Sequence, residues 1–193
     1  DAALWSALGK IPRKGKGLAR WAAKVRRLPG LLSLTRRSDG KIAIEIRKVA
    51  TGYRMTNRGD VFAEEILIYT RYLVSSISRR GCLYQAPRVS FSSHALQRYA
   101  VRSNASLGAG FEDAVYAEAR RLLSRMEDEL FFEDGGDHYF PTRDDGVWAG
   151  ALEETSCETW WRPVDDEWPC LWLAIRTFLS PEQLRPMVRN CWV

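Results

Sequence analysis

The clearest pattern of hydrophobic and polar positions lies in the second half of the chain. Across residues 111–129, apolar side chains recur every three or four positions, which is typical of an amphipathic helix. A shorter helix of about three turns is predicted after Ser92 and Ser93, because serine is a preferred residue immediately before a helix. Residues 88–91, just before it, are predicted to form a short strand. This part of the chain is therefore expected to begin with one strand and two helices.

Strand signals follow the two helices. Four strands are predicted, over residues 129–133, 137–142, 147–154 and 170–180. The sequence Asp-Gly-Gly-Asp between the first two predicts a hairpin turn. The last strand is a continuous apolar run, which is typical of a central position in a sheet. Ser180 and Pro181 then predict the start of a short helix.

The first half of the chain has weaker signals. Residues 41–49 alternate between apolar and polar side chains after an Asp-Gly turn, which predicts a half-buried strand. Residues 61–77 are interpreted as a long helix, because large apolar side chains recur along one helical face. These side chains are Phe62, Ile66, Tyr69, Leu73 and Ile77. The first 37 residues are predicted to hold one or two short helices.

Together these elements predict an α+β fold in two parts. Residues 1–87 are expected to form a basic, mainly helical N-terminal region with one strand. Residues 88–193 are expected to form an α+β domain in the order β-α-α-β-β-β-β. In this domain the two helices would pack on a small antiparallel sheet.

Charge is distributed unevenly along the chain. Ten Lys or Arg and one acidic residue lie between Asp1 and Arg37, whereas residues 127–167 hold fourteen acidic residues and two arginines. A basic segment of this density attracts nucleic-acid phosphates or an anionic membrane. The alternative is that it docks on the acidic region of its own chain. The candidate nucleic-acid contacts are Lys14, Lys16, Arg20, Lys24, Arg27, Arg102 and Arg143.

Composition limits the class of protein. No apolar run approaches the roughly 18 residues of a membrane helix, and no signal peptide is recognisable. The four cysteines include no Cys-x-x-Cys pair, so we expect buried thiols in a reducing, cytoplasmic compartment, with a single disulfide as the alternative. Because the chain begins with Asp1 rather than Met, we expect either a fragment of a larger protein or an artificial boundary.

Candidate chemistry gathers on the helix predicted after Ser93. His94, Arg98 and Arg102 are spaced four residues apart, so they share one helical face. A histidine, with an ordinary pKa of about 6.5, suits acid–base catalysis, and arginines suit phosphate binding. The structural alternative is a solvated helix face with the histidine packed against the sheet.

The last predicted strand carries a second pair of candidates. Arg176 and Thr177 are adjacent, and side chains alternate along a strand, so only one faces a given site unless the strand bulges. An arginine within an apolar strand needs a partner, and pairing with an acidic residue is the structural alternative.

The first predicted hairpin carries His138 and Arg143. His138 is the only other histidine of the chain, so it is either a second proton-transfer group or a structural residue. No metal-binding or cofactor-binding motif is recognisable, and we expect no cofactor. A metal-dependent nuclease built from the acidic residues at the turns stays an alternative.

Two short motifs resemble a known superfamily. Residues 90–103, SFSSHALQRYAVRS, are similar to the opening motif of small bacterial domains in which a strand precedes His-Ala-Leu-x-Arg and a second arginine. Residues 172–180, WLAIRTFLS, are similar to their closing strand. With two helices and antiparallel strands between them, the second half resembles the RelE-like, barnase-like and EndoU-like ribonuclease toxin superfamily.

The resemblance implies a bacterial toxin or effector domain that cleaves RNA, such as tRNA or rRNA, without a metal ion. A 2′-hydroxyl would attack the adjacent phosphate and leave a cyclic phosphate. His94 is implied as acid or base, Arg98 as a phosphate ligand, and Arg176 or Thr177 as a contact of the pentavalent intermediate. A protein partner, such as a cognate antitoxin or immunity protein, is also expected.

Two alternatives stay open. A non-enzymatic module would bind nucleic acid or a membrane through the basic N-terminal helices, and a protein through the acidic, Trp-containing residues 155–169. An ADP-ribosyltransferase-like toxin is the other, although no Arg…Ser-Thr-Ser…Glu series is recognisable.

Overall fold

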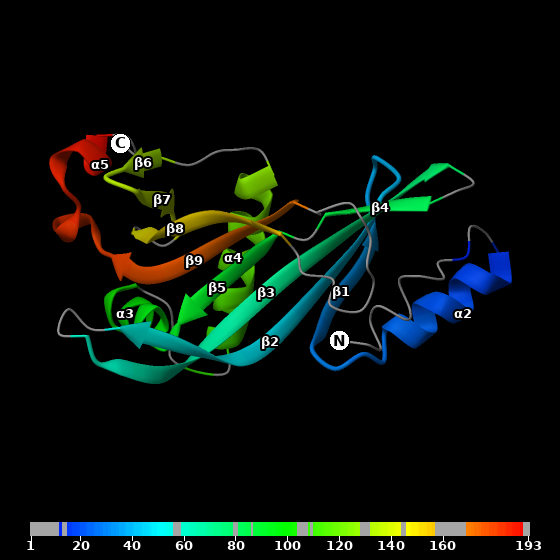
Figure 1. Cartoon of the computed structure of the whole chain (residues 1–193), viewed down its shortest axis with the longest axis horizontal. Helices are drawn as coiled ribbons and strands as arrows, with labels where there is room; N and C mark the ends of the chain where they lie inside the picture. The colour runs from blue at the N-terminus through cyan, green and yellow to red at the C-terminus, as the bar shows by residue number, and fades with distance from the viewer. Residues whose placement is uncertain are drawn as a thin grey trace. The chain divides into compact units, whose positions relative to one another are not determined.

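The structure is a computed structural model, and its elements carry the labels of Figure 1. It describes residues 12, 15–55, 59–78, 81–85, 87–103, 108, 110–127, 132–143, 146–156 and 169–190. The predictions for Lys14 and for most of the Trp-containing segment 155–169 lie outside the described residues. So do most of the predicted turn at residues 144–146 and the side chains of all four cysteines.

Strands dominate the described chain. They are β1 (Leu31–Arg36), β2 (Ile42–Met55), β3 (Val61–Ser78), β4 (Gly81–Gln85), β5 (Arg88–Ser92), β6 (Phe132–Asp134), β7 (Asp137–Pro141), β8 (Val147–Ser156) and β9 (Pro169–Leu179). The helices are α2 (Gly15–Val25), α3 (Ser93–Arg102), α4 (Phe111–Glu127), the 3₁₀ helix η1 (Pro181–Gln183) and α5 (Pro186–Asn190).

The predicted fold class is wrong, because these strands form one large mixed sheet. The strand order is β1-β2-β3-β5-β9-β8-β7-β6, and β4 pairs with β3. β5 and β9 run parallel, whereas the hairpins β1–β2, β3–β4, β6–β7 and β7–β8 are antiparallel. The architecture is therefore neither two helices on a small sheet nor purely antiparallel.

The largest local error concerns β3, which was predicted as a helix over residues 61–77. All residues from Tyr69 to Val74 are buried, so this part of the strand is covered on both faces. A strand buried on both faces loses the alternation of apolar and polar positions that identifies half-buried strands. The N-terminal region is likewise not mainly helical, because β1 to β4 follow α2.

The predictions for single elements of the second half are confirmed. α3 begins after Ser92, whose side chain accepts a hydrogen bond from the Ala95 amide at 3.1 Å. Gly135 and Gly136 both have positive φ, as the hairpin turn between β6 and β7 requires. β9 lies between β5 and β8, which is the central position predicted for it.

The residues group into two compact units. Unit 1 comprises Asp1–Arg47, Thr70–Ala86 and Ser156–Pro169, and unit 2 comprises Lys48–Tyr69, Pro87–Thr155 and Cys170–Val193. β2 and β3 each contribute residues to both units. The predicted domain boundary between residues 87 and 88 stays a prediction.

Within unit 1, a buried ion pair ties β2 to β3. The guanidinium Nη2 of Arg71 lies 2.8 Å from Oε1 of Glu45, and both side chains are only 6% exposed. Ser33 on β1 donates a hydrogen bond of 2.8 Å to the second carboxylate oxygen. The buried carboxylate of Glu45 therefore accepts hydrogen bonds from both a cation and a neutral hydroxyl, as a buried charge requires.

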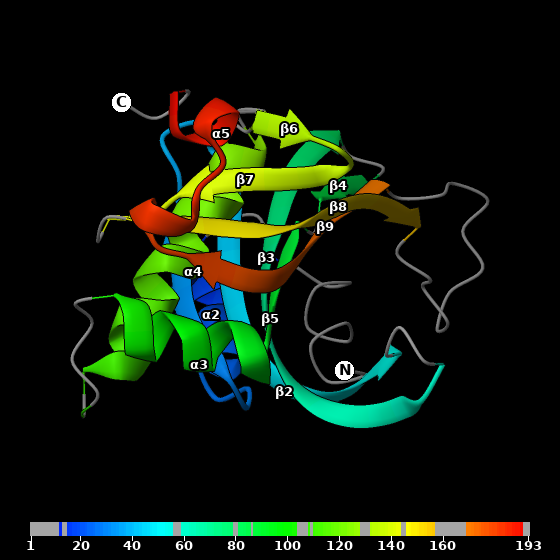
Figure 2. The same ribbon diagram turned by 90° about the vertical axis from the view of Figure 1, so that its left-hand side faces the viewer.

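Within unit 2, α3 and α4 cover one face of the sheet (Figure 2). Tyr99 of α3 contacts the ring of Trp148 in β8 in a tilted arrangement, at 4.8 Å between centroids. Glu118 of α4 accepts a hydrogen bond of 3.2 Å from the indole nitrogen of the same Trp148. Because one strand side chain points to one face only, both helices lie on that face.

The opposite face of unit 2 is covered by η1 and α5. Tyr139, Val147 and Ala149 alternate with the side chains that face α3 and α4, and they form a small core with Val188 of α5. Figure 1 shows α5 beside β6, at the end of the strand order. The sheet of unit 2 is thus covered by α3 and α4 on one face and by η1 and α5 on the other, and the pocket described below lies on the second of these faces.

Candidate functional site

The candidate site is built around an irregularity near the end of β9. Ile175 pairs with Phe91 of β5, whose ring contacts Trp148, so Ile175 faces the helices. Phe178 also faces them, because its ring contacts Trp148 and Tyr99. Two residues, rather than one, therefore separate consecutive helix-facing positions, as in a β-bulge. Such a bulge allows the adjacent residues Arg176 and Thr177 to serve one site, which regular strand alternation does not.

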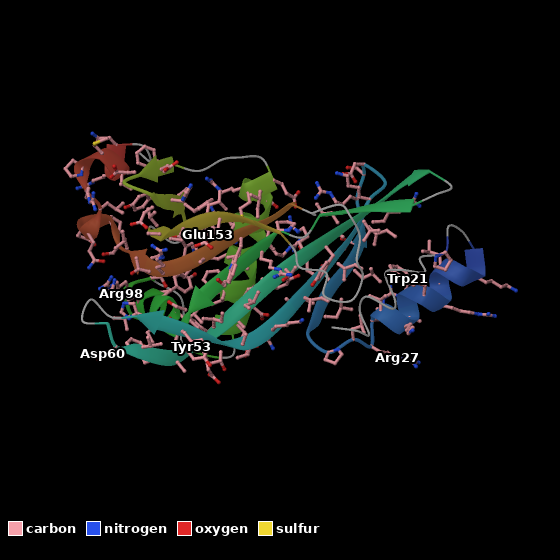
Figure 3. The ribbon with its side chains drawn as sticks, in the orientation of Figure 1. Trp21, Arg27, Tyr53, Asp60, Arg98 and Glu153 are labelled. Carbon is pink, nitrogen blue, oxygen red and sulfur yellow. The ribbon has the colours of Figure 1, made fainter. Side chains whose placement is uncertain are left out.

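Two arginines of α3 reach this end of β9. Arg98 donates a hydrogen bond of 2.6 Å from Nη1 to Oγ1 of Thr177, and Arg102 donates one of 3.0 Å to the backbone oxygen of Phe178. Figure 3 shows Arg98 near the C-terminal end of β9. His94 is half-buried, one helical turn before Arg98 on the same face. The structure therefore brings the predicted residues Arg98, Arg102 and Thr177 together.

Arg176 is the exposed cation of the same segment. Its side chain is 63% exposed, and its Nη1 lies 3.6 Å from Oδ1 of Asp137 on β7. An ion pair this exposed contributes little to stability and exchanges readily with solvent. Arg176 is therefore available to an anionic ligand, and its acidic partner is Asp137 rather than Glu153, Glu154 or the acidic loop that the sequence suggested.

A pocket of about 270 Å³ lies on the side of the sheet that η1 and α5 cover. Its polar lining consists of Asp137, Tyr139, Thr177, Gln183 and Arg185. Thr177 therefore links the pocket to the arginines of α3. Of these lining residues, only Thr177 was predicted from the sequence as a catalytic residue. For Asp137 and Tyr139, the available signal was their spacing of two residues on one predicted strand, which places both side chains on the same face.

Tyr139 is the buried hydroxyl-bearing residue of the pocket. Burial raises the pKa of its phenol above the ordinary value of 10.0, and the nearby carboxylate of Asp137 raises it further. The guanidinium group of Arg185 opposes this shift. Tyr139 therefore stays protonated at neutral pH and is a neutral hydrogen-bond donor.

The raised pKa of Tyr139 predicts a pH-dependent stability. Below pH 10 the phenol is protonated in both the folded and the unfolded chain. As the pH rises above 10, the unfolded chain releases this proton first, so the free energy of unfolding falls until the folded phenol also ionises. Urea unfolding at several pH values between about 8 and 11 should show that the free energy of unfolding falls more steeply with pH for wild type than for Tyr139→Phe. The same pH dependence in both proteins would contradict a raised pKa of Tyr139.

His138 lies on the other face of β7 from the pocket. It sits between Asp137 and Tyr139, which line the pocket, so its side chain alternates to the opposite face. Its Nδ1 accepts a hydrogen bond of 3.3 Å from the Leu152 amide, and its Nε2 lies 3.9 Å from Glu133. These contacts support the structural interpretation of His138 rather than the catalytic one.

The other predicted contact residues lie apart from the pocket lining. Arg143 has an exposed side chain, and its backbone amide donates to Glu118 at 3.3 Å. On α2, the side chains of Trp21 and Val25 are buried. The basic side chains around them are exposed at Lys16, Arg20, Lys24 and Arg27.

The described residues hold neither a candidate metal centre nor a membrane-spanning helix. Among them, no group of three or more His, Cys, Asp or Glu side chains is arranged to hold a metal ion. None of the described helices has the length and apolar character needed to cross a membrane.

Comparisons of this chain with protein-family models, with curated proteins and with solved structures found no match. Function is therefore inferred from the site itself and from the two sequence motifs.

Proposed function

We propose that unit 2 binds RNA at the end of β9 and cleaves it without a metal ion. The observation that carries this proposal is the convergence of three arginines on residues 176–178. Arg98 and Arg102 reach the segment by hydrogen bonds, and Arg176 belongs to it. Guanidinium groups form charge-assisted, paired hydrogen bonds with phosphate oxygens, and a cluster of them is a phosphate-binding device.

The same cluster suits the transition state of RNA cleavage. When the 2′-hydroxyl attacks phosphorus, negative charge builds up on the equatorial oxygens of the pentavalent phosphate. Fixed cationic donors aimed at those oxygens stabilise this state more than the ground state. Thr177 keeps Arg98 directed at this point, because its hydroxyl accepts one N–H of the guanidinium group.

His94 completes the proposed chemistry as the proton-transfer group. Its imidazole accepts the proton of the 2′-hydroxyl while that oxygen bonds to phosphorus. The bond between phosphorus and the 5′-oxygen breaks, and the imidazolium returns the proton to the 5′-oxygen, directly or through water. The products are a 2′,3′-cyclic phosphate and a 5′-hydroxyl, so no oxidant, metal or co-substrate is consumed.

The biological setting follows from the resemblance. A domain with this activity would act as a bacterial toxin or effector on tRNA or rRNA in the reducing cytoplasm. A cognate antitoxin or immunity protein would be its protein partner.

The test is incubation of the full chain with total tRNA and rRNA in EDTA. Wild type is expected to cleave, and Thr177→Val is expected to cleave roughly tenfold more slowly, because Arg98 loses the acceptor that directs it. Thr51→Val is the matched control, since Thr51 is an exposed strand residue outside the site. Intact RNA after incubation with wild type would refute the proposed cleavage.

A second candidate function is binding of RNA without cleavage. The exposed basic face of α2 supports it, because Lys16, Arg20 and Lys24 recur at four-residue intervals beside a buried Trp21. In the same experiment, salt-dependent binding of RNA that stays intact would favour this alternative over the ribonuclease.

A further inference from the structure

We infer that the pocket beside Thr177 binds one unpaired base of the RNA whose phosphate is held at the end of β9. The inference rests on the proposed function and adds a substrate class to it: single-stranded RNA, recognised through a base as well as a phosphate. Of the two sequence motifs, only the closing strand reaches this pocket, which is assembled from β7, β8, β9 and the turn and helices that follow β9.

The size and the lining of the pocket suit a small ring. Its volume of about 270 Å³ lies just below the usual range for small-molecule sites. Its apolar lining includes Ala149, Leu184 and Val188, and these side chains are buried or half-buried. Apolar side chains combined with a few polar groups are the usual lining of a site for a ring with polar edges.

The pocket itself is a poor phosphate site, because the arginines at its rim, Arg176 and Arg185, are each paired with a carboxylate. Asp137 lines the pocket, and Asp134 lies beside it, 3.5 Å from Nη1 of Arg185. These carboxylates repel a phosphate, but they accept hydrogen bonds from the N–H groups of a base. The guanidinium groups of Arg98 and Arg102 lie instead on the α3 side of Thr177. The base and the phosphate of one nucleotide would therefore lie on opposite sides of Thr177, with the base in the pocket and the phosphate beside the arginines of α3.

The arrangement favours an unpaired strand. A base inside a duplex keeps its polar edge in the base pair, whereas an unpaired base can turn out and enter a pocket. Double-stranded RNA is therefore expected to bind through its phosphates alone, with lower affinity than an unpaired strand of the same length.

The experiment is a titration of the full chain with ribonucleoside 3′-monophosphates, ribose 5-phosphate and inorganic phosphate, followed by two-dimensional NMR. We expect each nucleotide that fits to bind at least about tenfold more tightly than ribose 5-phosphate, with shifts at pocket residues. Leu184→Trp fills the pocket and is expected to remove most of this preference. Met187→Trp is the matched control, because Met187 is 65% exposed and does not line the pocket.

A second variant guards against a folding defect in Leu184→Trp. Asp137→Asn keeps the shape of the rim but replaces a pure acceptor with a mixed donor and acceptor, so it should change the order of affinities among the four bases. Equal affinity for nucleotides and ribose 5-phosphate would overturn the inference, as would an unchanged order in Asp137→Asn.

The outcomes separate this inference from the proposed function. RNA cleavage in EDTA without any preference for nucleotides over ribose 5-phosphate would refute the base pocket and leave the ribonuclease intact. Nucleotide binding that is lost in Leu184→Trp, with no RNA cleavage by wild type, would support the pocket and refute the ribonuclease.

Discussion

Arg98→Ala is expected to slow RNA cleavage in EDTA by about two to three orders of magnitude, the usual cost of removing one preorganised transition-state donor. The physical reason is that Arg98 is held by Thr177 at 2.6 Å, so its guanidinium group is already positioned when charge develops on the phosphate. Arg98→Lys should recover part of the rate, because it keeps the charge and loses the planar fork.

The measurement is the single-turnover rate on one defined single-stranded RNA, with circular dichroism to confirm folding. Arg120→Ala is the matched control, because Arg120 is exposed on α4 and its guanidinium lies 5.8 Å from the ring centre of Tyr116. Rates within about twofold of wild type for Arg98→Ala would show that Arg98 is a structural residue.

Trp148→Ala is expected to lower the free energy of unfolding by about 3–5 kcal/mol, as large aromatic truncations in cores do. Trp148 is fully buried, and its ring contacts Phe91, Tyr99 and Phe178. Its indole N–H also donates to the buried carboxylate of Glu118. Because a domain is usually stable by only about 5–15 kcal/mol, this variant should be close to unfolding at 37 °C.

Urea unfolding of Trp148→Phe separates the contribution of ring packing from that of the indole hydrogen bond. It keeps much of the ring packing and removes the indole donor of Glu118, which still accepts from Arg121 and from the Arg143 amide. A loss of about 1–3 kcal/mol is expected for it. If Trp148→Ala lost less than about 1 kcal/mol, Trp148 would not be the core residue that joins α3 to α4.

Both predictions depend on contacts that the sequence could not supply. The hydrogen bond between Arg98 and Thr177 joins residues 79 positions apart. The spacing of His94, Arg98 and Arg102 on one helix was readable, because it follows from local helical geometry. That this face meets the end of β9 depends on the parallel pairing of β5 with β9, which leaves no local signal in the sequence.

The difference between local signals and contacts between distant residues also explains the errors in the predicted fold. The hairpin between β6 and β7 was predictable, because Gly135 and Gly136 specify its turn locally. β3 was mistaken for a helix because burial on both faces hides the period of two, and only its β-branched and aromatic content favoured a strand. The pocket was missed because Tyr139, Gln183 and Arg185 come from separate elements.

The bulge in β9 illustrates the limit of strand alternation. Alternation alone placed Arg176 and Thr177 on opposite faces, and the sequence offered no glycine at that point to indicate a bulge. The burial of both Ile175 and Phe178 reveals it in the structure.

The central claim is a metal-independent transesterification at the end of β9, and its products test it most directly. Phosphorus-31 NMR of a short single-stranded RNA incubated with the full chain in EDTA should show a 2′,3′-cyclic phosphate that grows with time and is absent with His94→Ala. RNA that stays intact, or cleavage products that appear only with added metal ions and carry 5′-phosphates, would contradict the account.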